Sequence, residues 1–150
     1  MKVSPQDKKF ITRLKSSKFS AEGFLGDDKR PVDEIISDDL LTIQRLGISV
    51  EEIADILKQI YKKARSNLGA SIEIREGVTA TFYESMGRIP SPFIGDGVFE
   101  KGEAVVTDQA TGKTMIITQL GINLIEKHRF FQGRGSRYRT DPEDIAALLL

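Results

Sequence analysis

The sequence predicts an α+β fold, with N-terminal helices packed on a small antiparallel sheet of about four strands and two short C-terminal helices after it. Three observations predict this fold. Apolar residues recur at helical spacing up to residue 69, alternate with polar residues over 70–119, and return to helical spacing over 120–150. A chain of 150 residues is expected to form a single domain with these three parts.

Three helices are expected in the N-terminal part. The first spans residues 5–19, where Phe10 and Leu14 belong to an apolar face opposite a lysine-rich one. The second begins near Pro31, because proline is favoured in the first turn of a helix. It is expected to end at Gly47, since glycine readily adopts the left-handed conformation that closes a helix.

The third helix has the clearest local signal. Ser49 followed by Glu52 forms a capping box, in which each side chain satisfies a backbone N–H at the start of the helix. The apolar face begins at Ile53, and Gly69 is expected to stop the helix. We expect the second and third helices to form an antiparallel hairpin.

Residues Arg45–Leu57 resemble the turn and second helix of helix-turn-helix DNA-binding proteins. The resemblance implies a helix whose first residues read base edges and phosphates. Here those residues are Glu51, Glu52 and Asp55, which DNA repels. A capped helical hairpin is therefore the preferred interpretation.

The central part shows the period of two that is typical of strands. Gly77 either turns a hairpin or marks a bulge. Residues 88–97 are predicted to form a loop, because Pro90 and Pro92 cannot donate hydrogen bonds to a sheet. The strands are expected over residues 72–75, 78–83, 103–107 and 114–118.

Two helices are expected in the C-terminal part. One begins near Leu120 and runs to His128, and the stripe formed with Leu124 indicates a partly buried histidine at its end. The other begins with Asp141 as N-cap and Pro142 as first helical residue.

Composition excludes several classes of site. With no cysteine and one histidine, zinc fingers, iron–sulfur clusters and thiol nucleophiles are excluded. Asp96, Glu100 and Glu103 match no calcium-loop spacing, so we expect no metal and no cofactor. The start of the sequence has no apolar signal segment, and no run of 18 apolar residues occurs. We expect a cytoplasmic protein that does not enter membranes.

The densest cationic stretch, residues 127–139, is the best candidate for function and is called here the Arg-rich segment. Arginines match phosphate or carboxylate oxygens, glycines let backbone N–H groups approach an anion, and aromatic rings stack on bases. We expect a non-enzymatic module that binds an anionic ligand, phosphate or nucleic acid, or a protein partner. The residues expected to bind are Arg129, Arg134, Arg137, Tyr138 and Arg139.

A structural interpretation of the same segment stays open. Its arginines would pair with acidic groups of the chain, and Phe130 and Phe131 would anchor it to the core. The net charge of zero disfavours nucleic acid as the ligand, because affinity for a phosphate backbone is mainly electrostatic.

Two alternative functions remain. His128 is the natural acid or base of a small enzyme, assisted by Glu84 or Asp96 in a pocket beside the Pro90–Gly97 loop. A packed or capping histidine explains the same position without catalysis. Alternatively, an exposed sheet edge or the first helix forms a protein–protein or homodimer interface.

Overall fold

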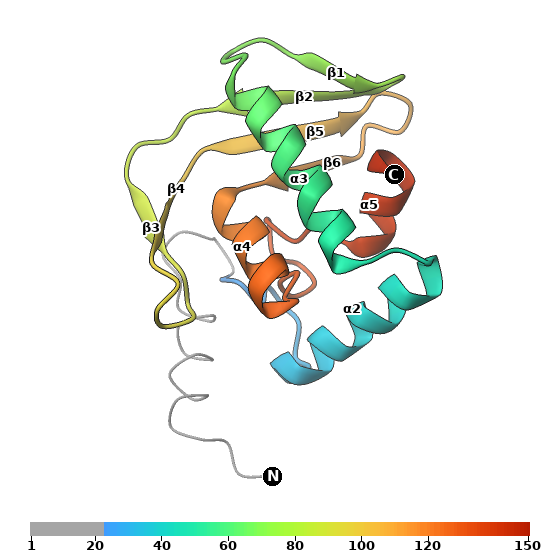
Figure 1. Ribbon diagram of the computed structural model, residues 1–150, viewed down its shortest axis with the longest axis vertical. Helices are drawn as coiled ribbons and strands as arrows, with labels where there is room; N and C mark the ends of the chain where they lie inside the picture. Colours follow the sequence, from blue (N-terminus) through green and yellow to red (C-terminus); the bar gives the residue numbers. More distant parts are fainter. Residues whose placement is uncertain (1–22) are drawn as a thin grey trace.

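The computed structural model describes residues 23–150, so the helix expected over residues 5–19 lies outside the described part of the chain. The fold is α+β, as the sequence predicts (Figure 1). In chain order the elements are α2 (Val32–Leu46), α3 (Val50–Arg65), β1 (Ile72–Arg75), β2 (Val78–Tyr83), β3 (Arg88–Pro90), β4 (Val98–Glu100), β5 (Glu103–Asp108), β6 (Thr114–Ile117), α4 (Gln119–His128) and α5 (Pro142–Leu149).

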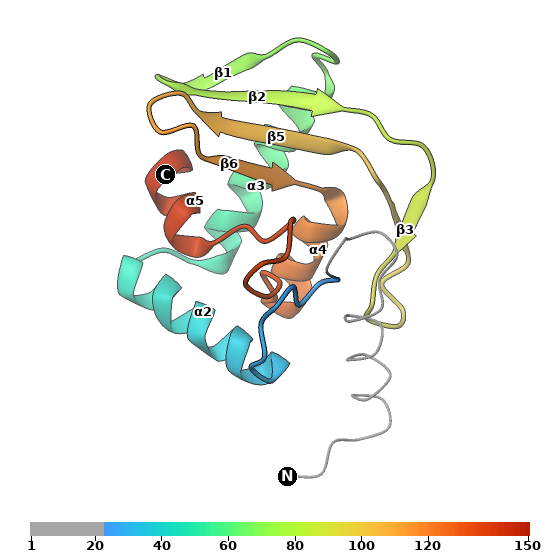
Figure 2. The same ribbon diagram turned by 180° about the vertical axis from the view of Figure 1, so that it is seen from behind.

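The main sheet has four antiparallel strands in the order β1-β2-β5-β6, which confirms the expected number and direction. Alternate residues of β2 and β5 are buried, among them Val78, Phe82 and Val106. Helix α3 packs across these two strands, and α4 and α5 complete the core beside it (Figures 1 and 2). The strand β1 forms one edge of the sheet, and the association of copies through this edge stays a prediction.

Both alternatives at the β1–β2 connection are present together. Gly77, with φ 79°, lies in the tight turn between the strands. A shift in pairing register also occurs between Glu73 and Arg75. The bulge therefore lies in β1, and the glycine serves the turn.

The prediction of a loop over residues 88–97 was wrong at its start. Arg88–Pro90 form β3 and pair with β4, leaving 91–97 as the connection. Pro90 is compatible with a strand here because it is the last residue of a two-stranded ribbon. Residues 84–102, called here the arm, extend from β2 and β5 and place this ribbon beside α4 (Figure 1).

The signals for the end of α2 and the start of α3 are confirmed, but the capping box is only half formed, because the Glu52 carboxylate accepts from the Ser49 hydroxyl at 3.2 Å and not from the Ser49 backbone N–H. Gly47 closes α2 with φ 72°, and the Ser49 hydroxyl accepts a hydrogen bond from the Glu52 backbone N–H at 3.1 Å. The expected end of α3 at Gly69 was wrong. The helix ends at Arg65, and Gly69 lies in the following turn with φ 77°.

The expected antiparallel hairpin of α2 and α3 was also wrong, because α2 packs against α5 (Figure 2). The buried face of α2 contains a carboxylate, Asp39, between Ile35 and Ile43. A buried carboxylate needs a charged or hydrogen-bonding partner. Asp39 finds this partner in Arg139 of the C-terminal part of the chain, and this ion pair accompanies the apolar packing of Ile35 and Ile43 that holds α2 there.

Two clusters of buried apolar residues hold the described part of the chain together. The larger cluster joins the sheet to α3, α4 and α5 and contains Phe131. The smaller one joins Phe24 and Leu25 to α2, α4 and Phe130, with residues of the arm packed against it. Both phenylalanines of the Arg-rich segment are fully buried, which confirms them as anchors. Within residues 23–150, none of the helices has the length and apolar character needed to span a bilayer.

Candidate ligand-binding cavity

The Arg139 side chain forms its hydrogen bonds with other residues of the protein and is largely buried. Its guanidinium donates to both oxygens of Asp39, at 2.8 and 2.9 Å, and to the backbone carbonyl of Gln132 at 2.7 Å. The side chain is only 9% exposed. Burial alone would lower the pKa of Arg139, but the carboxylates of Asp39 and Asp141 hold it above its usual value. Arg139 is therefore a charged structural residue that ties the Arg-rich segment to α2.

The glycines of the Arg-rich segment make close backbone contacts with the first described residues. A Cβ atom on Gly133 would lie 2.2 Å from the carbonyl oxygen of Leu25, and one on Gly135 would lie 2.3 Å from Oδ1 of Asp27. Gly26 faces the same segment equally closely. We call Gly26, Gly133 and Gly135 the glycine interface. Glycine is needed here because any side chain would separate the two backbones.

A backbone N–H of the Arg-rich segment does approach an anion, but this anion is a carboxylate of the protein itself. The Arg134 N–H donates to Oδ2 of Asp28 at 3.1 Å, and Arg30 holds the same carboxylate through two side-chain bonds. The Arg30 guanidinium, followed by the Arg134 N–H, keeps the pKa of Asp28 well below its usual range despite burial. The Arg134 side chain is exposed and pairs with no acidic group in the described residues.

Arg129 lies at the end of α4 in a left-handed conformation, with φ 57°. Its guanidinium pairs with Glu51 at 2.9 Å and also donates to the carbonyl of Glu126. The structure therefore sends the four arginines to different places. Arg129 and Arg139 are engaged by other elements, whereas Arg134 and Arg137 remain exposed.

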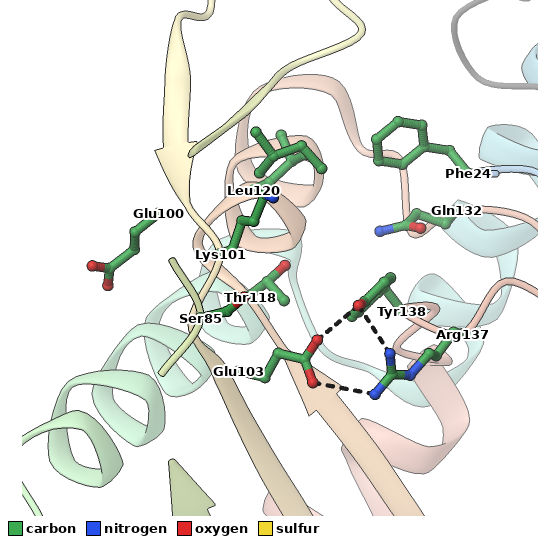
Figure 3. Close-up of a pocket in the computed structure, with 11 residues that line it drawn as sticks. Phe24, Ser85, Glu100, Lys101, Glu103, Thr118, Leu120, Gln132, Arg137 and Tyr138 are labelled. Atoms are coloured by element: carbon green, nitrogen blue, oxygen red, sulfur yellow. Dashed lines mark hydrogen bonds and ion pairs between the residues drawn. The ribbon is translucent and has the colours of Figure 1, made fainter. Parts of the chain in front are cut away.

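Arg137 and Tyr138 line a cavity of about 340 Å³ between the arm and the C-terminal part of the chain (Figure 3). Lys101 adds a second cationic side chain and Glu103 an acidic one, and Glu100 also contributes to the wall. The remaining walls are apolar or carry neutral polar groups. The apolar residues are Phe24, Ile89 and Leu120. The neutral polar residues are Ser85, Thr118 and Gln132.

Glu103 is bound by both site residues at the rim of the cavity. The Tyr138 hydroxyl donates to Oε2 at 2.7 Å, while Arg137 Nη2 reaches Oε1 at 3.3 Å (Figure 3). Burial, followed by the hydrogen bond to Glu103, raises the pKa of Tyr138 to about 12. Tyr138 therefore remains a neutral hydrogen-bond donor at physiological pH.

The Glu100 carboxylate points away from the cavity, toward Tyr61 and Arg65 on α3 (Figure 3). Burial alone would raise the pKa of Glu100, but the bonds from Tyr61 and Arg65 hold it below its usual value. The three carboxylates considered for a metal thus have separate partners. Within residues 23–150, no group of three or more potential metal ligands is present.

His128 lies beside one of the two carboxylates considered for it. Its Nε2 atom is 2.8 Å from Oδ2 of Asp96, which also accepts hydrogen bonds from Asn123 at 2.7 Å and from Ser91 at 3.0 Å. Burial alone would raise the pKa of Asp96, but these three bonds lower it. The ring of Phe93 stacks on the imidazole with centroids 3.5 Å apart. The contacts attach the tip of the arm to α4.

The other expected partner of His128 is elsewhere. Glu84 lines a separate hollow beside Arg65. Neither this hollow nor the cavity at Arg137 has His128 in its wall. None of residues 90–97 lines either of these two hollows, and the catalytic role of His128 stays a prediction.

The sequence interpretation missed several cavity residues, of which Gln132 and Phe24 are the clearest. Gln132 lies within the Arg-rich segment but has no property in the sequence that distinguishes it from a loop glutamine. Phe24 lies 113 positions before Arg137, and only the fold brings them to one cavity. No protein-family model, curated protein or solved structure matches the chain, so its function is inferred from this geometry alone.

Proposed function

We propose that this protein is a non-enzymatic binding module for a small anionic ligand, which places its acidic group against Arg137 in the cavity beside the arm. One observation carries the proposal: two residues expected to bind a ligand, the exposed Arg137 and the partly exposed Tyr138, line the same cavity. The lining combines apolar surface with a few polar groups, as is usual for small-molecule sites.

Arg137 has hydrogen-bonding capacity left for a ligand. A guanidinium has five N–H donors, and Arg137 uses Nη1 toward the Tyr138 hydroxyl and Nη2 toward Glu103, both at 3.3 Å. Its side chain is 59% exposed. Glu103 keeps the shorter bond from Tyr138 when Arg137 turns toward a ligand. Binding therefore does not leave a carboxylate without a partner.

The dimensions of the cavity favour a small molecule over nucleic acid. A volume of about 340 Å³ lies at the lower end of the range for small-ligand pockets. The chain has no net positive charge, and phosphate-backbone binding depends on several neutralised phosphates. A single acidic group needs only one guanidinium.

The test is an NMR titration with acetate, pentanoate, benzoate, inorganic phosphate and pyrophosphate at low ionic strength. We expect saturable amide shifts at Phe24, Thr118 and Tyr138 for at least one anion. Arg137→Ala should weaken that binding at least about tenfold, since a charge-assisted hydrogen bond contributes about 1.5–3 kcal/mol. Salt should also weaken it.

Arg134→Ala is the matched control, because Arg134 belongs to the same segment but lies outside the cavity. It should leave affinity unchanged. Equal affinity in the wild type and Arg137→Ala, or shifts confined to residues outside the cavity, would exclude this site.

A second candidate is a small enzyme with His128 as acid or base. The supporting observation is that Asp96 holds Nε2 while no group within residues 23–150 hydrogen-bonds to Nδ1. Chromogenic ester and phosphoester substrates test it. Turnover that disappears in His128→Gln would support catalysis, whereas turnover unaffected by His128→Gln, or no turnover above buffer, would contradict it.

A further inference from the structure

Gln132 is an unusual residue in the wall of the cavity. It is 97% buried, with 3% relative exposure, yet it lines the hollow. Its backbone has φ 73°, a left-handed conformation that a residue with a side chain rarely adopts. Such conformations persist only where surrounding contacts enforce them, and they concentrate at functional sites.

Two contacts enforce this position. Arg139 Nη1 donates to the Gln132 backbone carbonyl at 2.7 Å, and Arg139 is itself fixed by Asp39. The buried Ser136 hydroxyl donates to Oε1 of Gln132 at 2.8 Å. Both oxygens of Gln132 are therefore occupied by the protein.

The amide nitrogen has a different environment. Figure 3 shows Nε2 of Gln132 turned into the space bounded by Phe24, Leu120 and Tyr138. Within residues 23–150, no protein oxygen accepts a hydrogen bond from it. Every fully buried side-chain nitrogen or oxygen in the described part of the chain has a hydrogen-bond partner, so this unbonded Nε2 atom is open to the space of the cavity. A ligand oxygen in the cavity can therefore accept its hydrogen bond.

We propose that Gln132 is a second recognition point, and that the ligand is a monocarboxylic acid with another acceptor oxygen on its apolar part. The inference depends on the proposed function, since Arg137 is the residue that binds the carboxylate. A monoanion fits better than a dianion, because Glu103 lies beside the guanidinium and repels additional negative charge. The apolar part of the acid would contact Phe24, Ile89 and Leu120.

The test compares keto acids with plain acids of equal chain length. The probes are 4-oxopentanoate, 5-oxohexanoate and 6-oxoheptanoate against pentanoate, hexanoate and heptanoate, titrated by NMR. We expect at least one keto acid to bind about tenfold more tightly than its plain counterpart, because a site with a fixed donor discriminates against ligands that lack the acceptor.

Variants assign this preference to Gln132. Gln132→Leu should abolish the preference while retaining binding of the plain acid, and Arg137→Ala should weaken both. Gln132→Asn keeps the amide but withdraws it from the cavity, and should reduce the preference if Gln132→Leu does not fold. Gln59→Leu, at an exposed position of α3, is the matched control and should change neither affinity.

The possible results separate the two proposals. Equal affinity for every keto and plain pair, or a preference that survives both Gln132 variants, overturns the role of Gln132 and leaves the cavity site standing. Binding of inorganic phosphate without any of the acids overturns the ligand class only. If no acid and no phosphate binds, the proposed function is wrong and the inference is wrong with it.

Discussion

Arg137 and Arg139 are two positions apart and differ completely in their surroundings. Arg139 is 9% exposed and bonded to two carboxylates and a carbonyl, whereas Arg137 is 59% exposed with two long contacts. Arg139 thus stabilises the packing of the Arg-rich segment on α2, whereas Arg137 faces the cavity. The difference shows that the position of the partner, Asp39 or Glu103, determines the role of each arginine.

The largest effect should separate the two arginines in stability. Arg139→Met leaves the Asp39 carboxylate buried without its partner, which should reduce the free energy of unfolding by about 3 kcal/mol. Arg137→Met removes an exposed contact and should cost less than about 1 kcal/mol. Urea denaturation of both variants measures the difference. Similar losses of unfolding free energy in the two variants would contradict the distinction between a structural Arg139 and a cavity-facing Arg137.

A smaller effect is expected at the glycine interface. A Cβ atom on Gly133 would lie 2.2 Å from the Leu25 carbonyl oxygen, so Gly133→Ala should destabilise the protein by about 2 kcal/mol. Gly112→Ala is the control, because Gly112 has φ 75° but open space around it. Gly112→Ala should reduce the free energy of unfolding by about 1 kcal/mol, because of backbone strain alone. Thermal unfolding distinguishes the two, and a Gly133→Ala cost no greater than the control would contradict the close contact.

The smallest effect should appear in acid. The pKa of Asp28 in the folded protein lies below its ordinary value near 3.8, so ionised Asp28 stabilises the fold above that value and loses this contribution as the pH falls further. From pH 4 to pH 3 the loss from this group should be about 1 kcal/mol. Denaturation at both pH values should show a shallower fall in Asp28→Asn than in the wild type.

Asp33→Asn, at an exposed position in the first turn of α2, is the control for the acid experiment. It should retain the pH dependence of the wild type. If the unfolding free energy of Asp28→Asn and of the wild type fell equally with pH, the pKa of Asp28 would be the same in the folded and unfolded protein, and its bonds from Arg30 and the Arg134 N–H would not lower it.

Local signals in the sequence were sufficient for most elements of the fold. The Ser49 capping box, the glycine after α2 and the proline at the start of α5 depend on neighbours within a few residues. The position of α2 could not be predicted this way. It involves tertiary contacts such as the ion pair between Asp39 and Arg139, which are 100 residues apart and carry no local sign of each other in the sequence.

The candidate site was predictable only in part. The Arg-rich segment contains Arg137, Tyr138 and Gln132 of the cavity, but its composition treats all four arginines alike. Which of them keep unused donors depends on tertiary partners such as Glu51 and Asp39. The left-handed backbone of Gln132 has no local cause, since glutamine does not favour that conformation.

The glycine interface has a consequence for the order of events during synthesis. The backbone that Gly26 contacts is made more than a hundred residues after Gly26 itself. Closing so large a loop is entropically slow. The nascent chain must therefore expose Phe24 and Leu25 until residues 133–136 have been made, and we expect this stretch to be where chaperones bind the unfinished protein.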